Sequence, residues 1–217
     1  MTHSFDRRGF LRAGAATVMG GAWLMGCATD NTEPTPATRT STPDSARVLL
    51  AYFSRAGENY HYGGRKNLEV GNTEVLAGMI SDSIACDVHR IEAAEPYPDG
   101  YDDTVERNVR EQEDDARPAI AGALPDIAGY DVVLLGSGLW NVRPPMIMRT
   151  FTDGLDFTGK TVLPVVTYAV SGIGNAPEDY ADACPGATIG DGLAVRGEEV
   201  TQAGDAVSSW LQRVNLR

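Results

Sequence analysis

Cysteine and histidine are both scarce in this chain, which has three of each among its 217 residues. The histidines are far apart: His3 is near the N-terminus, His61 lies in a polar stretch, and His89 lies in a predicted strand. A structural metal site needs several such ligands close together, so this spacing predicts none. Cys86 and Cys184 could form a disulfide only with their Cα atoms within about 7 Å of each other. Their predicted elements lie on opposite sides of a sheet, and we therefore expect free, buried thiols.

Positive charge is also in short supply. The chain has 18 lysines and arginines against 30 aspartates and glutamates, which gives a formal net charge of −12. Proteins that bind nucleic acid or anionic lipid through charge need a basic surface, so this composition argues against both ligands. An acidic surface is instead consistent with docking onto basic patches of other proteins.

Long hydrophobic runs are absent as well. The apolar stretch Ala13–Met25 contains several glycines and is too short to span a bilayer stably. It follows Arg7-Arg8-Gly9-Phe10-Leu11 and runs into Leu24-Met25-Gly26-Cys27. Together these segments resemble a twin-arginine export signal that ends in a lipobox, where a bacterial lipoprotein is cleaved and lipidated.

This resemblance implies a chain of three parts. Residues 1–26 would be the signal peptide, and Cys27 would carry the lipid. Residues 27–45, rich in Thr, Pro, Asp and Ser, would form a disordered tether. Residues 46–217 have a length typical of one domain. We expect that domain to be held at the extracytoplasmic face of the cell membrane.

Strand and helix patterns alternate through residues 46–217, which predicts an α/β fold with a parallel sheet. The acidic segment Asp102–Asp115 is interpreted as the solvated face of a helix. We expect strands at about 47–53, 87–93, 131–137, 161–167 and 187–195, and helices at about 73–84, 103–116, 145–153, 177–183 and 198–214.

The most informative motif closes the first predicted strand. Ala51-Tyr52-Phe53-Ser54-Arg55-Ala56-Gly57 is followed, after an insert at 58–70, by Gly71-Asn72-Thr73-Glu74. A strand that ends in such a turn and opens a helix offers hydroxyls and backbone N–H groups to a phosphate, with the positive end of the helix dipole behind them.

This loop resembles the phosphate loop of the flavodoxin family, Ser/Thr-x-Thr-Gly-x-Thr, which holds the phosphate of FMN. Ser54 and Gly57 match its first half, and Asn72 and Thr73 would complete it beyond the insert. The family's second hydroxyl residue is Ala56 here. A backbone amide, Asn59 or the insert would then have to supply the missing donor.

Two later loops extend the resemblance. After the strand at 131–137, Gly136 and Gly138 would let the backbone approach a flat ring, and Trp140 would supply an aromatic wall. The family carries Gly-x-Pro-x-Trp at this point, and Gly138 stands at the proline position. After the strand at 161–167, the small-residue loop ending at Asn175 would face the polar edge of the flavin, with Tyr168 as a second stacking partner.

The resemblance implies a flavodoxin-like, doubly wound sheet of five parallel strands in the order 2-1-3-4-5, with helices on both faces. Ligands of such sheets bind at the carboxyl ends of the strands. The implied cofactor is FMN. The implied cofactor-binding residues are Ser54, Arg55, Ala56, Gly57, Asn59, Asn72, Thr73, Ser137, Gly138, Leu139, Trp140, Asn141, Thr167, Tyr168, Ser171, Gly172 and Gly174.

Three functions remain open at this point. The first is an electron carrier that docks with an unidentified redox partner protein. The second is an FMN-dependent oxidoreductase that passes electrons from NAD(P)H to quinones or other small acceptors. The third is a non-redox binding lipoprotein whose flavin site has decayed, for which Ala56 and Gly138 are the motivating departures.

Overall fold

The computed structural model describes residues 46–217. The predicted signal peptide, the tether and Cys27 lie outside the described residues. Within 46–217, every helix is too short or too polar to cross a bilayer.

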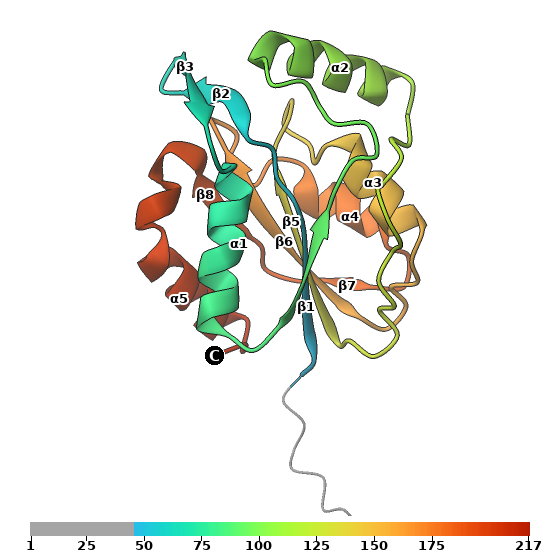
Figure 1. Ribbon diagram of the computed structural model, residues 1–217. Coiled ribbons are helices and arrows are strands. Elements are labelled where there is room, and N and C mark those ends of the chain that lie inside the picture. Colours follow the sequence, from blue (N-terminus) through green and yellow to red (C-terminus); the bar gives the residue numbers. More distant parts are fainter. Residues whose placement is uncertain (1–45) are drawn as a thin grey trace, which may run out of the picture. The chain divides into compact units, whose positions relative to one another are not determined.

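A parallel sheet forms the centre of the domain (Figure 1). Its strand order is β4-β1-β5-β6, and β7 and β8 both pair with β6, so the expected order 2-1-3-4-5 is confirmed. The predicted fifth strand is divided in two because the sequence Gly190-Asp191-Gly192 interrupts it. The strands are β1 (Val48–Phe53), β4 (Asp87–Ile91), β5 (Val132–Gly138), β6 (Thr161–Tyr168), β7 (Thr188–Ile189) and β8 (Leu193–Arg196).

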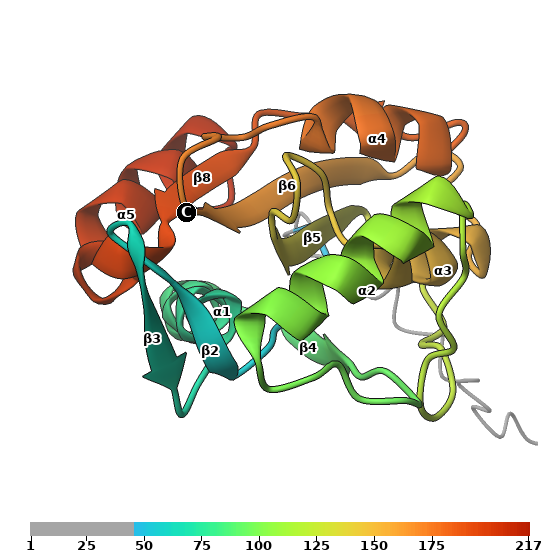
Figure 2. The ribbon, with the colours of Figure 1, turned by 90° about the horizontal axis from the view of Figure 1, so that it is seen from above.

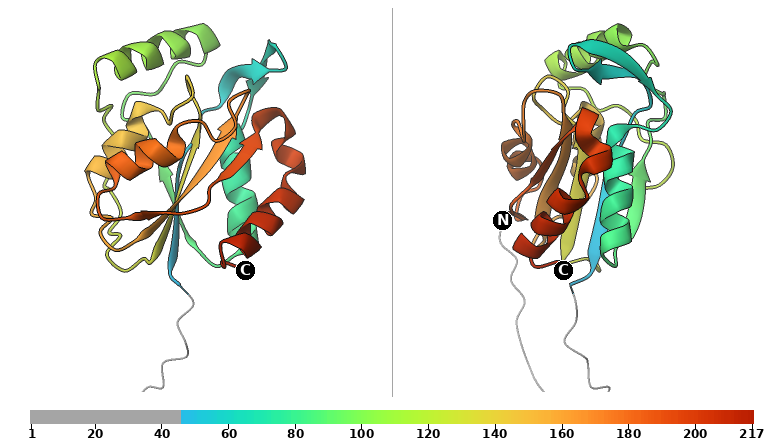
Figure 3. Two further views of the ribbon diagram at one scale, coloured as in Figure 1. Left: turned by 180° about the vertical axis from the view of Figure 1, so that it is seen from behind. Right: turned by 90° about the vertical axis from the view of Figure 1, so that its left-hand side faces the viewer.

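Helices cover both faces of this sheet, as expected (Figure 3). One face carries α1 (Asn72–Ser83) and α5 (Gly204–Arg213), and the other carries α3 (Met146–Asp153) and α4 (Ala176–Ala183). The helix predicted at 198–214 begins with a separate 3₁₀ turn, η1 (Gly197–Gln202), before α5 starts.

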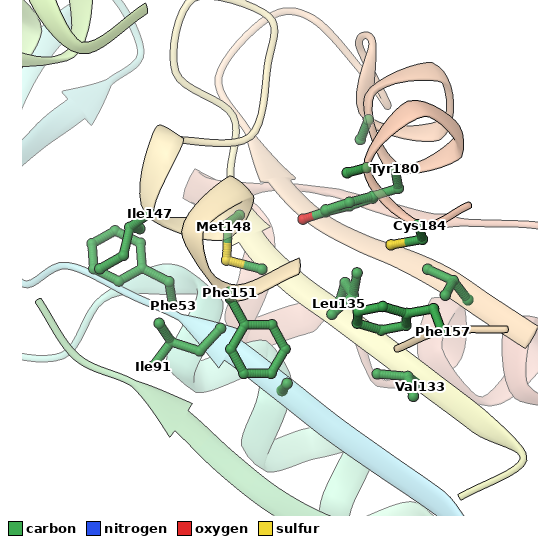
Figure 4. Close-up of a cluster of buried hydrophobic side chains, with 14 of the residues drawn as sticks. Phe53, Ile91, Val133, Leu135, Ile147, Met148, Phe151, Phe157, Tyr180 and Cys184 are labelled. Atoms are coloured by element: carbon green, nitrogen blue, oxygen red, sulfur yellow. The ribbon is translucent and has the colours of Figure 1, made fainter. Parts of the chain in front are cut away.

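The strand sequences explain why the sheet is buried on both faces. All six residues of β1 are buried, and their side chains alternate between two cores. Leu49, Ala51 and Phe53 join the core under α3 and α4, which Figure 4 shows around Phe151 and Phe157. The intervening residues of β1 join the core under α1 and α5. Continuous apolar runs of this kind are typical of parallel sheets.

Two elements stand above the carboxyl edge of the sheet (Figure 2). One is α2 (Tyr101–Glu113), and the other is an antiparallel hairpin of β2 (Gly57–His61) and β3 (Gly64–Leu68). The hairpin takes up most of the insert at 58–70, a segment in which the sequence predicts no strand. Its turn residues Tyr62 and Gly63 have φ values of 47° and 85°, as a two-residue hairpin turn requires. We call this hairpin and α2 together the roof.

Both cysteines of the described residues are free, as expected. Cys184 is buried under the sheet, whereas Cys86 is only partly buried. Burial raises the pKa of the Cys184 thiol to about 12, so this side chain is neutral at physiological pH and packs as an apolar group.

Candidate functional site

A cavity of about 310 Å³ lies at the carboxyl edge of the sheet. Its walls come from the ends of β1, β5 and β6, the start of α1, η1 and both parts of the roof. The three loops singled out in the sequence therefore converge. The predicted residues that line this cavity are Ser54, Arg55, Asn59, Asn72, Thr73, Gly138, Leu139, Trp140, Asn141, Thr167 and Tyr168.

The first turn of α1 forms one end of the cavity. Its early N–H groups have no partner within the helix, and Asn72 and Thr73 both face the cavity. Ser54 closes the turn, because its Oγ accepts a hydrogen bond of 3.0 Å from the N–H of Glu74. The hydroxyl proton of Ser54 remains available for an anion. A Cβ atom at Gly71 would collide with Ser54 Oγ and lie 2.5 Å from the carbonyl oxygen of Arg55, so only glycine allows this close approach.

A pair of threonines joins this helix end to the sheet. The hydroxyl oxygens of Thr73 and Thr167 are 2.8 Å apart, and both residues are buried. One hydroxyl of the pair donates to the other, so the start of α1 and the end of β6 are held at a fixed separation. The start of a helix and the end of a strand thus meet at one cavity.

Trp140 supplies an aromatic wall. Its ring packs edge-on against Phe53 and Tyr97, with centroid distances of 5.8 and 5.0 Å. The Trp140 backbone begins a tight turn in which Asn141 and Val142 have φ values of 54° and 61°. Positive φ is unusual for a β-branched residue, so neighbouring contacts must hold this turn.

Those contacts come from α2 and from the loop after β6. Gln112 donates from Nε2 to the carbonyl of Trp140 at 3.1 Å and accepts from Asn141 Nδ2 at 3.2 Å. From the other side, the N–H of Asn175 donates to the carbonyl of Val142 at 2.9 Å. The wall of the cavity is therefore fixed by two separate elements.

Six predicted residues do not line the cavity. Gly57 (φ 80°) lies against the backbone of Asp99, where a Cβ atom would come within 2.8 Å of the carbonyl oxygen. Ser137 is fully buried inside the sheet, and its Oγ has no hydrogen-bond partner. Gly174 packs against Val142, so its loop supports the Trp140 turn. The six residues are Ala56, Gly57, Ser137, Ser171, Gly172 and Gly174.

Apart from Asn59, the sequence patterns did not identify the cavity residues of the roof or those of η1. On α2, Tyr101, Val105 and Val109 recur every four residues on an otherwise acidic helix, a spacing that indicates one apolar face. The segment Asp102–Asp115 is thus more than the solvated face we expected. The additional lining residues are Tyr60, Tyr101, Thr104, Val105, Asn108, Val109, Ala169, Gly197 and Glu198, together with Phe53 of β1.

Charged side chains play a structural part around the cavity. Arg55 donates to the carbonyls of Pro98 and Asp99, each at 3.0 Å, and to the carbonyl of Glu58. Burial lowers the pKa of Arg55. Glu198 accepts from the N–H of Tyr62 at 3.0 Å. Because Arg55 is used in this way, a phosphate here would be held by hydroxyls, backbone amides and the α1 dipole.

A family model described as flavodoxin matches residues 47–214. The chain belongs to the flavodoxin family. No curated protein matches the chain.

Solved structures agree with membership of the flavodoxin family. A protein of Bacteroides uniformis described as a flavoprotein shares 26% sequence identity, with a TM-score of 0.61 over 78% of this chain and 99% of its own. A second, from Bacteroides eggerthii, also shares 26% identity, with a TM-score of 0.62 over 79% and 99% of the two chains. A flavoprotein of Lactobacillus acidophilus, solved in complex with FMN, shares the fold at 16% identity, with a TM-score of 0.54 over 75% and 99%.

Proposed function

We propose that this protein binds FMN in the cavity and transfers electrons at the extracytoplasmic face of the cell membrane. The observation that carries the proposal is the convergence of the α1 N-terminus, the Trp140 turn and the end of β6 on one cavity. A related fold from Lactobacillus acidophilus has been solved with FMN, which supports the choice of cofactor.

The residues present fit the two ends of this cofactor. Ser54, Asn72 and Thr73 would hold the phosphate at the start of α1, where unpaired N–H groups and hydroxyls lie together. Trp140 and Tyr168 would flank the ring, and Gly138 leaves room for it beside Thr167. The bound flavin would supply one- and two-electron transfer, for which the protein provides position and electrostatics.

The charge of the protein would tune this chemistry. The net charge is −12, and negative surroundings disfavour the addition of further negative charge to a bound group. Each tenfold bias of this kind lowers a one-electron potential by about 59 mV. The same acidic surface would favour docking with a basic redox partner.

The membrane location is proposed from the N-terminal sequence. The paired arginines Arg7-Arg8 and the segment ending in Cys27 support export and lipidation. The tether of residues 27–45 would let the domain reach partners beyond the lipid surface. Stable anchoring would need more than one acyl chain, because a single chain binds membranes only marginally.

Titration of the purified protein with FMN, and separately with riboflavin, tests the cofactor proposal by visible absorption. Tight FMN binding with weak riboflavin binding is expected, since the start of α1 would hold the phosphate, which riboflavin lacks. Equal binding of the two would contradict the phosphate assignment. Failure to bind either would favour the binding lipoprotein with a decayed site.

Addition of NADPH to the FMN complex separates the carrier from the oxidoreductase. The flavin of a carrier should remain oxidised without an added reductase. Rapid loss of its visible absorption would instead indicate the oxidoreductase. The carrier is preferred because, besides the predicted flavin phosphate loop, no glycine-rich fingerprint for a dinucleotide such as NADPH follows a strand in this sequence.

A further inference from the structure

The hairpin of the roof is attached to the start of α2. The N–H of Glu58 donates to the carbonyl of Asp99 at 2.8 Å, and Glu58 Oε2 accepts from the N–H of Tyr101 at 3.1 Å. Gly100, at the N-cap of α2, has no side chain with which to cap the helix. Glu58 therefore supplies the cap from the hairpin and places a carboxylate at the positive end of the helix dipole.

Arg65 makes the second attachment. Its guanidinium carbon lies 3.6 Å from the centroid of the Tyr101 ring, and its Nη2 lies 3.7 Å from Asp102 Oδ1. In the hairpin register Arg65 is paired with Tyr60. Tyr60 and Tyr101 both line the cavity, whereas Arg65 does not. Arg65 thus contacts one cavity-lining tyrosine, Tyr101, and is the strand partner of a second, Tyr60.

The far end of the hairpin is attached to a different element. At the turn, the N–H of Tyr62 donates to Glu198 Oε1 of η1 at 3.0 Å. The hairpin is therefore fastened to α2 on one side and to η1 on the other, and the cavity has walls from all three. Figure 2 shows the hairpin and α2 together above the sheet edge.

These attachments differ from the packing of the sheet. They are hydrogen bonds, an ion pair and a cation–π contact, and β3 has four exposed residues out of five. Segments with few buried apolar contacts open locally without global unfolding. The hairpin is thus able to separate from α2 while the sheet stays folded.

We propose that the hairpin of residues 57–68 is a clasp that sets how fast flavin leaves the cavity, with Arg65 as its positioning residue. This proposal rests on the proposed binding of FMN. Flavin leaves when the hairpin separates from α2, and the contact of Arg65 with Tyr101 opposes that separation. Arg65 would act through Tyr101, because it lies outside the cavity that the cofactor would occupy.

The test compares Arg65→Gln and Arg65→Lys with the matched control Lys66→Gln, an exposed neighbour on the same hairpin. The rate of FMN release is measured after mixing the loaded protein with an excess of a flavin-scavenging protein. Arg65→Gln should release FMN about three to ten times faster, as expected for the loss of one cation–π contact. Arg65→Lys should be intermediate, and Lys66→Gln should match the unsubstituted protein. Equal release rates for Arg65→Gln and Lys66→Gln would overturn the clasp.

A second readout needs no flavin. Amide hydrogen exchange in the first turn of α2 should be faster in Arg65→Gln than in Lys66→Gln, while exchange in β1 and β5 stays unchanged. Unchanged exchange at α2 would overturn the clasp even if FMN binds tightly. Faster exchange together with no FMN binding by any variant would instead overturn the proposed cofactor. The two readouts therefore distinguish a failure of the clasp from a failure of the proposed FMN binding.

Discussion

The sheet and the roof are stabilised by different interactions, although they meet at one cavity. Every residue of β1 is buried and apolar. The buried residues of α2 are Thr104, Asn108 and Glu111, all of them polar. Apolar burial makes the sheet a rigid platform for the loops that follow its strands. Polar contacts fix the roof in a defined position and can be broken individually.

The roof is itself attached unevenly. The second half of α2 is held by Glu111, which accepts from the hydroxyl of Tyr97 at 2.8 Å and from Arg107 Nε at 2.7 Å. Arg107 also lies 3.9 Å from the Tyr97 ring centroid. Burial and the nearby Glu111 carboxylate raise the pKa of Tyr97 above its ordinary value. This buried cluster anchors the C-terminal half of α2, whereas the ion pair of Arg65 with Asp102 at the hairpin end is exposed.

The largest effect should follow from a truncation in the core of the domain. Phe151 of α3 is fully buried against β1 and β4 residues. Phe151→Ala should lower the free energy of unfolding by about 3 to 5 kcal/mol, because it removes apolar contacts and leaves a cavity. Urea unfolding of the flavin-free protein, followed by far-ultraviolet circular dichroism, measures the change.

The matched roof variant is Val105→Ala. Val105 is 42% exposed, so its truncation should change the free energy of unfolding by no more than about 0.5 kcal/mol. Similar losses for the two variants would mean that the roof is part of the cooperative core, and the contrast between the two regions would fail.

Two glycines, Gly71 at the N-cap of α1 and Gly78 within the helix, offer a test where the sheet and the cavity meet. A Cβ atom at Gly71 would collide with Ser54 Oγ and lie 2.5 Å from the Arg55 carbonyl oxygen, whereas a Cβ atom at Gly78 would meet nothing within 4 Å. Gly71→Ala should cost about 1 to 3 kcal/mol of stability, because the loop must shift. It should also weaken FMN binding by about tenfold or more.

Gly78→Ala is the control on the same helix. It should raise the free energy of unfolding by about 0.5 to 1 kcal/mol through helix propensity and leave FMN affinity unchanged. Urea unfolding and visible-absorption titration give both quantities. Unchanged FMN affinity in Gly71→Ala would place the phosphate away from the start of α1.

The sheet could be predicted from the sequence because its signal is local. Runs such as Val48–Phe53 are apolar at every position, and each ends in a loop of small residues. Strand order followed from the resemblance of those loops to a known family. The prediction of one strand at 187–195 was wrong, because Gly190-Asp191-Gly192 interrupts it.

The cavity could be predicted mainly where it is built from strand ends and from the start of α1. Ser54, Trp140 and Thr167 each follow or end an apolar strand, and the structure brings them together. The roof could not be derived in this way, because the contact of Arg65 with Tyr101 joins segments without a shared periodic pattern. Only the spacing of Tyr101, Val105 and Val109 on α2 gave a usable signal.

The smallest expected effect concerns pH at the edge of the sheet. His89 on β4 is stacked on Phe151, with ring centroids 5.7 Å apart. Burial lowers the pKa of His89 below its ordinary value of 6.5. The unfolded chain therefore takes up this proton first, so the contribution of neutral His89 to stability is complete above pH 6.5 and is lost as the pH falls through the folded-state pKa.

Unfolding free energies at pH 7.5 and 5.5, for the unsubstituted protein and for His89→Gln, isolate this contribution. The variant should lose less stability on acidification than the unsubstituted protein. The difference should be smaller than the stability changes expected for Phe151→Ala and Gly71→Ala. The proton destabilises the sheet edge against which Phe151 packs and leaves the attachments of the hairpin to α2 untouched. Hydrogen exchange should therefore increase at β4 before it increases at the first turn of α2. Equal acid sensitivity of the two proteins would show that other groups control stability in this pH range.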